Sequence, residues 1–305
     1  MRERLLGSSD LRVSVVGLGC NAFGWRIDAS ATRDVVNAAL EAGITFFDTA
    51  ESYGEGESEL FLGRALAGRR DQVVIGTKFG WGRGHGDNEI ARGAPAYVRE
   101  ALEGSLRRLG TDHVELYQYH RPDGVTPIAE TLGVLDELRT EGKIRATGSS
   151  NMSAAQVREA DGVSATQGLA RFVSAQNDYS LLERDAEREL IPVCEELGLG
   201  FIPFFPLARG LLTGKYRHGE EAPEGSRLAG SLELAAETWA ALERLEALAA
   251  RQGASLLELA IGGLAAQPAV ASVIAGATSA EQVRLNAAAG EWEPSPEALA
   301  ELRAL

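Results

Sequence analysis

Four ionisable side chains of different kinds lie at or just after the ends of three short apolar runs in the first half of the chain. Asp48 directly follows the run Ile44–Phe47, and Tyr53 comes shortly after it in a glycine-marked loop. Lys78 and His120 end the next two apolar runs. Short runs rich in β-branched and aromatic residues predict buried strands. Because parallel α/β folds carry their chemistry at the carboxyl ends of strands, we expect these side chains to share one site.

Such a group of side chains could protonate an oxygen on which negative charge is developing. A phenol has an ordinary pKa of about 10, so it becomes a better acid near neutrality if its pKa falls. A fall of about 3 units requires roughly 4 kcal/mol in favour of the phenolate. One ammonium ~4 Å away supplies about that much at an effective dielectric near 20. We therefore expect Lys78 to lower the pKa of Tyr53, and Asp48 to keep the buried lysine protonated.

Carbonyl reduction is the natural reaction of this group, with His120 donating a hydrogen bond to the reacting oxygen and orienting the substrate. The reaction also needs a hydride, which no side chain can supply, so a nicotinamide or a flavin is implied. Each residue has an ordinary structural explanation as well: a helix cap for the aspartate, a solvated surface for the lysine, and a structural role for the histidine. The prediction depends on their occurring together at neighbouring strand ends.

A second chemistry is open to the same residues. Lys78 could be the nucleophile of a Schiff-base aldolase. A carboxylate beside it, Asp48, argues against this because it would hold the amine protonated.

The composition bounds the class of protein. The chain has 305 residues, of which 45% are hydrophobic and 24% charged, as in a soluble globular protein with a full core. A net charge of −14 argues against nucleic acid or an anionic membrane surface as partner. Cys20 and Cys194 form no disulfide framework, and no secretory apolar segment, membrane-length run or metal-ligand spacing is seen. We expect a cytoplasmic protein without a metal site.

Apolar runs and amphipathic segments alternate along the chain and predict a (β/α)8 TIM barrel, as a single domain over residues 1–305. A β-hairpin is expected ahead of it, from Arg4–Leu6 and Leu11–Ser14. Strands are expected to begin near Val15, Ile44, Val73, Val114, Ile144, Phe172, Gly200 and Val270. Helices are expected from a cap at Ser30 or Thr32 to Ala42 and over 57–68, 95–109, 128–141, 153–160, 186–197, 254–266 and 280–289, with extra helices at Leu232–Arg251 and Ser295–Leu305.

Two long loops interrupt the regular spacing. One contains the glycine-rich stretch Gly80–Gly93, and the other runs over Leu207–Ser231. Loops of this length in a compact fold are usually lids or inserts. A third loop, Gly17–Ala22, has the spacing of a dinucleotide-binding turn, but no helix starts there, so we interpret it as the loop after the first barrel strand.

Several runs along the chain together carry a specific resemblance. They are Phe47–Gly54, Ser58–Glu59, Leu62–Gly63, Thr77–Gly80, Leu116–Asp123, Gly142–Arg145, Gly148–Asn151, Gln176–Leu182, Pro206–Tyr216 and Gly276–Asn286. The chain resembles the aldo-keto reductase family over essentially its whole length. The resemblance implies an NAD(P)H-dependent oxidoreductase with the (β/α)8 fold and a catalytic tetrad of Asp48, Tyr53, Lys78 and His120, in which Tyr53 donates the proton. Potassium-channel β-subunits share the resemblance, so a regulatory cofactor-binding module is a second hypothesis.

The resemblance also implies which residues contact the cofactor. The nicotinamide carboxamide would be held by Ser150, Asn151 and Gln176, beside Asp48. The ring and pyrophosphate would be lined by Phe204, Phe205, Pro206, Leu207, Gly210, Leu211 and Lys215, and the first loop would add Gly19, Cys20 and Asn21. The adenosine end would be met by Gly276, Thr278, Ser279, Gln282 and Asn286.

The chain departs from the family at places that bear on the cofactor. Phe204 keeps an aromatic face where a tyrosine is usual, and Phe205 stands where a serine is common. The last helix lacks the expected cations for a 2′-phosphate, although Arg284 is near. We expect NADPH, with NADH as the alternative. Around a small carbonyl substrate we expect Phe23, Trp25, Tyr53, Trp81 and His120, because aromatic walls suit an apolar compound.

Overall fold

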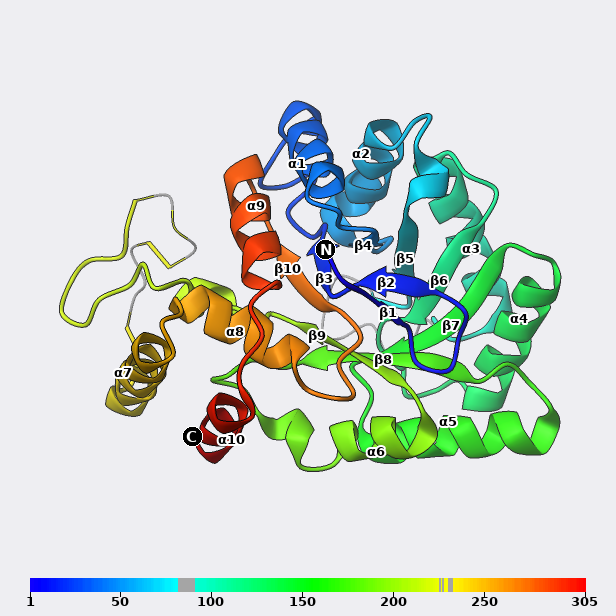
Figure 1. The fold of residues 1–305 in the computed structure, drawn as a ribbon. Coiled ribbons are helices and arrows are strands. Elements are labelled where there is room, and N and C mark those ends of the chain that lie inside the picture. Colours follow the sequence, from blue (N-terminus) through cyan, green and yellow to red (C-terminus); the bar gives the residue numbers. More distant parts are fainter. Residues whose placement is uncertain (82–90, 225, 227, 230–232) are drawn as a thin grey trace.

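A parallel barrel of eight strands, surrounded by helices, forms the body of the molecule (Figure 1). This computed structural model describes residues 1–81, 91–224, 226, 228–229 and 233–305. The strand order is β10-β3-β4-β5-β6-β7-β8-β9, and an isolated parallel bridge between Phe201 and Val270 joins the two ends. The barrel strands are β3 (Val16–Gly19), β4 (Phe46–Asp48), β5 (Val74–Phe79), β6 (Val114–Tyr119), β7 (Ile144–Ser150), β8 (Phe172–Asp178), β9 (Gly200–Phe204) and β10 (Val273–Gly276). The predicted (β/α)8 fold is confirmed.

The helices pack around the outside of the sheet. They are α1 (Ala29–Glu41), α2 (Glu57–Ala65), α3 (Pro95–Leu109), α4 (Ile128–Thr140), α5 (Ala154–Gln167), α6 (Leu190–Leu197), α7 (Ala236–Arg251), α8 (Leu256–Ala265), α9 (Ala280–Ala289) and α10 (Pro296–Ala304). Short 3₁₀ turns add η1 (Tyr53–Gly56), η2 (Arg70–Gln72), η3 (Asp185–Glu187) and η4 (Ala208–Thr213). Among the described helices, none combines the length and apolar character that crossing a bilayer requires.

Local capping chemistry sets several helix limits. The first helix begins at Asp28, whose carboxylate accepts a hydrogen bond from the Ala31 backbone N–H at 2.9 Å, so the predicted caps Ser30 and Thr32 were wrong. Ser153 and Gln156 form a capping box at the start of α5. That helix runs further than predicted because its stop signal is Gly168, in the left-handed conformation.

Other limits were also misjudged. The region 186–197 divides into η3 and α6 because Glu189 has a non-helical backbone with φ −136° between them. Helix α2 ends at Ala65, earlier than the predicted 68. The predicted start of the extra helix at Leu232 lies outside the described residues, as do parts of both long loops.

The predicted N-terminal hairpin, β1 (Glu3–Leu5) with β2 (Arg12–Ser14), closes the amino-terminal end of the barrel. Its apolar side chains pack with those of the barrel interior, in one buried cluster of Leu6, Leu11, Val13, Phe46, Leu116, Ala146, Ile202, Ala271 and Ile274. Gly7, with φ +56°, turns the hairpin where an added Cβ would lie 2.2 Å from the Val173 carbonyl oxygen. The hairpin therefore covers one end of the barrel and leaves the carboxyl ends of the strands for the site.

The segment after β9 builds a smaller core of its own. Trp239 of α7 is buried with Leu212 and Tyr216 against α8. His218 stacks on the Trp239 ring at 5.1 Å between centroids, so this histidine has a structural partner. Figure 1 shows α7 and the yellow loop before it standing to one side of the barrel.

Two helical glycines give a test of the packing between helices. An added Cβ at Gly63, in α2, would lie 2.3 Å from the Leu109 carbonyl oxygen at the end of α3, whereas at Gly133, in α4, it would meet nothing within 4 Å. We expect Gly63→Ala to lower the free energy of unfolding by about 1–3 kcal/mol through overpacking. Gly133→Ala should raise it by about 0.5–1 kcal/mol through helix propensity. Urea unfolding of the two variants measures both, and equal effects would contradict the close approach of α2 and α3.

Candidate active site

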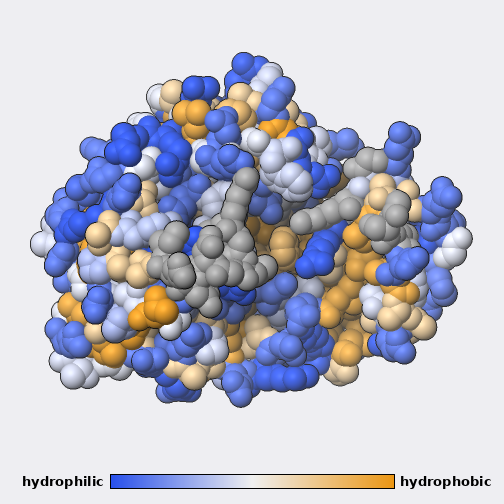
Figure 2. Space-filling view, turned by 180° about the vertical axis from the view of Figure 1, so that it is seen from behind, coloured by the Kyte–Doolittle hydropathy of each residue, from blue (hydrophilic) through white to orange (hydrophobic). Residues whose placement is uncertain are grey.

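A cavity of about 720 Å³ opens at the carboxyl ends of the barrel strands. Its volume lies within the range of about 300–1,000 Å³ that is usual for small-molecule sites. Figure 2, seen from the side opposite the hairpin, shows this face hollowed, with hydrophobic and hydrophilic side chains around the depression. The cavity lies where the predicted strand-end side chains meet.

A buried ion pair stands at the base of this site. Lys78 Nζ donates to Asp48 Oδ2 at 2.6 Å and to the Thr49 carbonyl oxygen at 2.9 Å, and the lysine side chain is fully buried. The two residues come from neighbouring strands, β4 and β5. Burial by itself would lower the pKa of Lys78, but Asp48 and Tyr53 together raise it above its ordinary value. The lysine therefore stays protonated at neutral pH.

The other oxygen of the carboxylate is held by two amides. Gln176 Nε2 donates to Asp48 Oδ1 at 2.8 Å and Gln118 Nε2 does so at 3.3 Å. Gln118 is on β6 and Gln176 on β8, so four strands converge on one carboxylate. Gln118 is a site residue that sequence reasoning missed, because it looks like an ordinary strand residue until the barrel closes.

Tyr53 points its hydroxyl at the same ammonium. Lys78 Nζ lies 3.4 Å from the Tyr53 hydroxyl and 5.1 Å from the centre of its ring. The structure corrects the expected pKa, however. Burial has the largest effect on the pKa of Tyr53 and raises it, and the opposing effect of Lys78 is smaller. Tyr53 is thus protonated at rest, and if it lost its proton the phenolate would form beside the Lys78 ammonium.

His120 lies on the other side of the phenol. Its ring meets the Tyr53 ring edge to face at 5.8 Å between centroids, and the Trp81 ring lies 4.9 Å away. Burial, aided by Lys78 and Arg121, lowers the pKa of His120 well below its ordinary value, so the imidazole is neutral. Its Nδ1 is buried without a hydrogen-bond partner in the described part of the chain.

Strained backbone gathers around the cavity. Among the described residues other than glycine, positive φ occurs at Glu55, Asn151, Phe205, Ala208 and Arg209. Asn151, Phe205 and Arg209 line the cavity. Such conformations are unfavourable for these residue types and cluster at functional sites. The loops after β7 and β9 therefore line the cavity in backbone conformations that are locally unfavourable.

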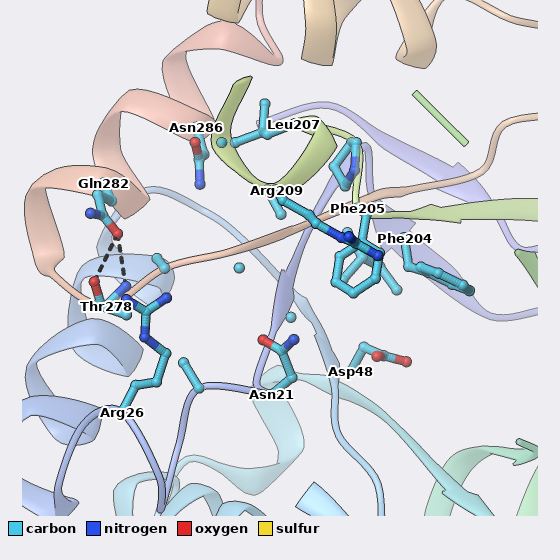
Figure 3. A pocket seen from close by; sticks show the side chains of 18 of the residues that line it. Asn21, Arg26, Asp48, Phe204, Phe205, Leu207, Arg209, Thr278, Gln282 and Asn286 are labelled. Atoms are coloured by element: carbon cyan, nitrogen blue, oxygen red, sulfur yellow. Dashed lines mark hydrogen bonds between the residues drawn. The ribbon is translucent and has the colours of Figure 1, made fainter. Parts of the chain in front are cut away.

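The far end of the cavity is formed where β10 leads into α9. Thr278 donates its backbone N–H to Gln282 Oε1 at 2.8 Å (Figure 3). Ser279 caps the helix by accepting from the Gln282 backbone N–H. Gly276 pairs in register with Gly19 of β3. This end thus combines glycine backbone with the start of a helix, an arrangement that suits a phosphorylated ligand.

Most of the predicted site residues line this cavity. Those that do are Gly19, Asn21, Trp25, Asp48, Tyr53, Trp81, His120, Ser150, Asn151, Gln176, Phe204, Phe205, Pro206, Leu207, Gly210, Lys215, Gly276, Thr278, Gln282 and Asn286.

Five predicted positions do not line the cavity. Cys20 and Phe23 are fully buried in the main hydrophobic core, which corrects Phe23 as a substrate wall and Cys20 as a cofactor contact. Leu211 packs against the α7 cluster. Ser279 uses its hydroxyl as a helix cap. Lys78 also lies behind the wall, where it acts through Asp48 and Tyr53.

The electrostatics of the wall contrast with those of the whole protein. The described lining contains three cations, Arg26, Arg209 and Lys215, and one carboxylate, Asp48, which Lys78 neutralises. The chain as a whole has a net charge of −14. A positive cavity in an acidic protein favours an anionic ligand with several charges. Sequence reasoning missed both arginines. Arg26 stands in a loop without a motif, and Arg209 lies within the run Pro206–Tyr216, where no role was expected for its charge.

These features fit a nicotinamide dinucleotide. Gly19, Gly210 and Gly276 leave backbone accessible along the wall, and Asn151 and Gln176 offer amides. Phe204 and Phe205 add aromatic faces, with rings 5.2 Å apart between centroids. Among the described residues, no cluster of side chains could hold a metal ion.

Comparison with known proteins agrees with this arrangement. The model of the family described as "Aldo/keto reductase family" matches residues 15–305. A relative from Oryza sativa subsp. japonica, named "Probable voltage-gated potassium channel subunit beta", is 36% identical over 320 aligned residues, covering 100% of this chain and 96% of the relative.

The ion pair predicts a coupled effect on stability. Lys78→Met leaves the Asp48 carboxylate buried without its cation, and we expect the free energy of unfolding to fall by about 3–5 kcal/mol. The double variant Asp48→Asn/Lys78→Met should be less destabilised than the sum of the two single variants. Lys143→Met, at a partly exposed ion pair, should change stability by only about 0–1 kcal/mol. Urea unfolding of the set tests this, and additive effects would contradict a coupled pair.

The neutral histidine predicts a pH effect. Because the folded pKa of His120 lies below the ordinary 6.5, the unfolded chain takes up a proton that the folded chain does not. The wild type should therefore lose stability, relative to His120→Gln, as pH falls below 6.5, by at most about 1.4 kcal/mol per pH unit. Above that pH the difference should be constant. Unfolding measured from about pH 8 to pH 5 tests the sign, and parallel curves would count against a buried neutral imidazole.

Proposed function

Because the chain belongs to the aldo/keto reductase family, we propose that it is an NAD(P)H-dependent enzyme that reduces an aldehyde or ketone to an alcohol. The observation that carries this proposal is the Tyr53 phenol in the cavity, 3.4 Å from an ammonium that Asp48 holds at 2.6 Å. A bound nicotinamide supplies the hydride. The side chains of the site donate the proton and orient the substrate.

Tyr53 is the proposed proton donor. Its pKa is raised by burial, so the hydroxyl keeps its proton until an acceptor oxygen gains negative charge. The ammonium of Lys78 then stabilises the phenolate as it forms, and Asp48 prevents the lysine from discharging. Lys78 therefore favours the Tyr53 phenolate that proton transfer produces, although the pKa of the resting phenol is raised by burial.

His120 is the proposed orienting group. A neutral imidazole can donate one hydrogen bond to the carbonyl oxygen without competing with Tyr53 for the proton. Trp81 packs on its ring and Trp25 lines the cavity, which suits a small carbonyl compound with an apolar body. The cofactor would be held by Ser150, Asn151 and Gln176 at one end and by Gly276, Thr278 and Gln282 at the other.

Two other functions can be weighed against this one. The rice relative is named a probable voltage-gated potassium channel subunit beta, which favours a regulatory role for this chain. In that role the chain would bind the cofactor with little turnover. The Schiff-base aldolase is disfavoured, because Lys78 is fully buried, donates to Asp48 and Thr49, and has a raised pKa. We also propose a cytoplasmic location, since the buried, unpaired Cys20 and Cys194 suit a reducing compartment.

Replacing the Tyr53 phenol distinguishes the hypothesis of an enzyme from that of a regulatory subunit. Wild-type protein should oxidise NADPH in steady state with simple aldehydes, and Tyr53→Phe should lower kcat by about 10²- to 10⁴-fold. Affinity for NADPH, measured by fluorescence titration, should change little because only the hydroxyl is lost.

Tyr117→Phe is the matched control, since its hydroxyl is buried and donates to the Val98 carbonyl oxygen at 3.3 Å, outside the cavity. That variant should keep wild-type turnover. Tight NADPH binding by the wild type with no turnover on any aldehyde or ketone would favour the regulatory subunit. Unchanged turnover in Tyr53→Phe would overturn the assigned proton donor.

A further inference from the structure

We propose that Arg26 binds the 2′-phosphate of NADPH and so gives this protein a preference for NADPH over NADH. The inference rests on the proposed function, and it names a residue that decides which cofactor the same site takes. The two cofactors differ by one phosphate on the adenosine ribose. An arginine near that ribose is the usual way in which a dinucleotide site accommodates this group.

The loop that carries Arg26 lies against the adenosine end of the cavity. Strands β3 and β10 pair in register, with Gly19 opposite Gly276, and Asn21 Oδ1 lies close enough to Gly276 that an added Cβ there would be 3.4 Å away. Figure 3 shows the Arg26 side chain directed toward Thr278, at the start of α9. Residues far apart in sequence are therefore brought to one end of the cavity by the closure of the barrel.

Arg26 is presented on a compact turn. Its backbone N–H donates to the Ala22 carbonyl oxygen at 2.9 Å, and the Gly24 N–H donates to the Ile27 carbonyl oxygen at 3.0 Å. The turn also packs against α2, because a Cβ at Gly24 would lie 2.4 Å from the Glu57 Cβ. A guanidinium on such a turn is positioned before the ligand arrives, so less freedom is lost on binding.

The charge of Arg26 is available to a ligand. In the described part of the chain it makes no ion pair; its guanidinium lies 5.9 Å from the centre of the exposed Trp25 ring. The nearest acid in sequence, Asp28, uses its carboxylate to cap α1. Within the described residues, Arg26 is thus an exposed cation at the cavity wall that has no acidic partner and no evident structural purpose.

The other cations near the cavity are placed for different tasks. Arg209 lies over the Phe205 ring, with its guanidinium 5.8 Å from the ring centre and directed away from Thr278 (Figure 3). Lys215 lies near Gly210, on the segment after β9. Arg284 of α9 pairs with Glu41 of α1 at 3.5 Å and does not line the cavity. Among the described cations of the wall, Arg26 is the one that faces the adenosine end.

The test is a comparison of binding affinities by quenching of tryptophan fluorescence. Arg26→Met removes the charge and keeps much of the aliphatic stem. We expect the Kd for NADPH to rise about 10- to 100-fold while the Kd for NADH stays within about twofold. The reason is that the variant loses a charged hydrogen bond to the 2′-phosphate, which only NADPH carries. Adenosine 2′,5′-bisphosphate should displace NADH from the wild type better than from Arg26→Met. The NADPH preference of the wild type should shrink as salt is raised.

Arg284→Met is the matched control, because it removes an exposed arginine from the same region without touching the cavity wall. It should leave both affinities unchanged. Equal affinity of the wild type for NADPH and NADH, or a preference that survives in Arg26→Met, would overturn the role of Arg26 and leave the proposed reductase intact. Failure of the wild type to bind either cofactor would overturn the proposed function itself.

Discussion

The buried pair of Asp48 and Lys78 is the interaction on which the rest of the site depends. Two charges removed from water are unfavourable unless they are close and their remaining hydrogen bonds are made. Here they are, through the Thr49 carbonyl oxygen on the lysine and two glutamine amides on the carboxylate. The partners come from β4, β5, β6 and β8. Such a pair can exist only in a closed barrel that brings four strand ends around one point.

Burial and charge act against each other at this site, and their balance differs from residue to residue. At Lys78 the neighbouring Asp48 carboxylate and Tyr53 raise the pKa by more than burial lowers it, and the lysine stays charged. At Tyr53 and His120 burial wins, so the phenol keeps its proton and the imidazole stays neutral. One ammonium is thus surrounded by two groups that are neutral at rest, which is the state needed to meet negative charge as it develops in a reaction.

The cavity continues from this centre to a second, more polar end. Aromatic rings lie around Asp48 and Tyr53, while arginine, glycine backbone and the start of α9 lie where the β3 and β10 ends meet. A site that combines aromatic rings and a phenol with a cationic region suits a dinucleotide with a small uncharged substrate. Asn151, Phe205 and Arg209, whose backbones have positive φ, line the same cavity.

Much of this protein could be predicted from residue types and their order. Strand runs, helix periodicity and glycine stops predicted the barrel, and the four ionisable residues at strand ends predicted the centre of the site, because both depend on patterns local in the chain. Other properties depend on contacts between distant segments. The burial of Phe23 and Cys20, the cap at Asp28, the convergence of Gln118 on Asp48 and the direction of the Tyr53 pKa shift needed the packed molecule. Arg26 is the plainest case: by itself it is one charge in a short loop, and only the pairing of the first and last barrel strands decides that it faces Thr278.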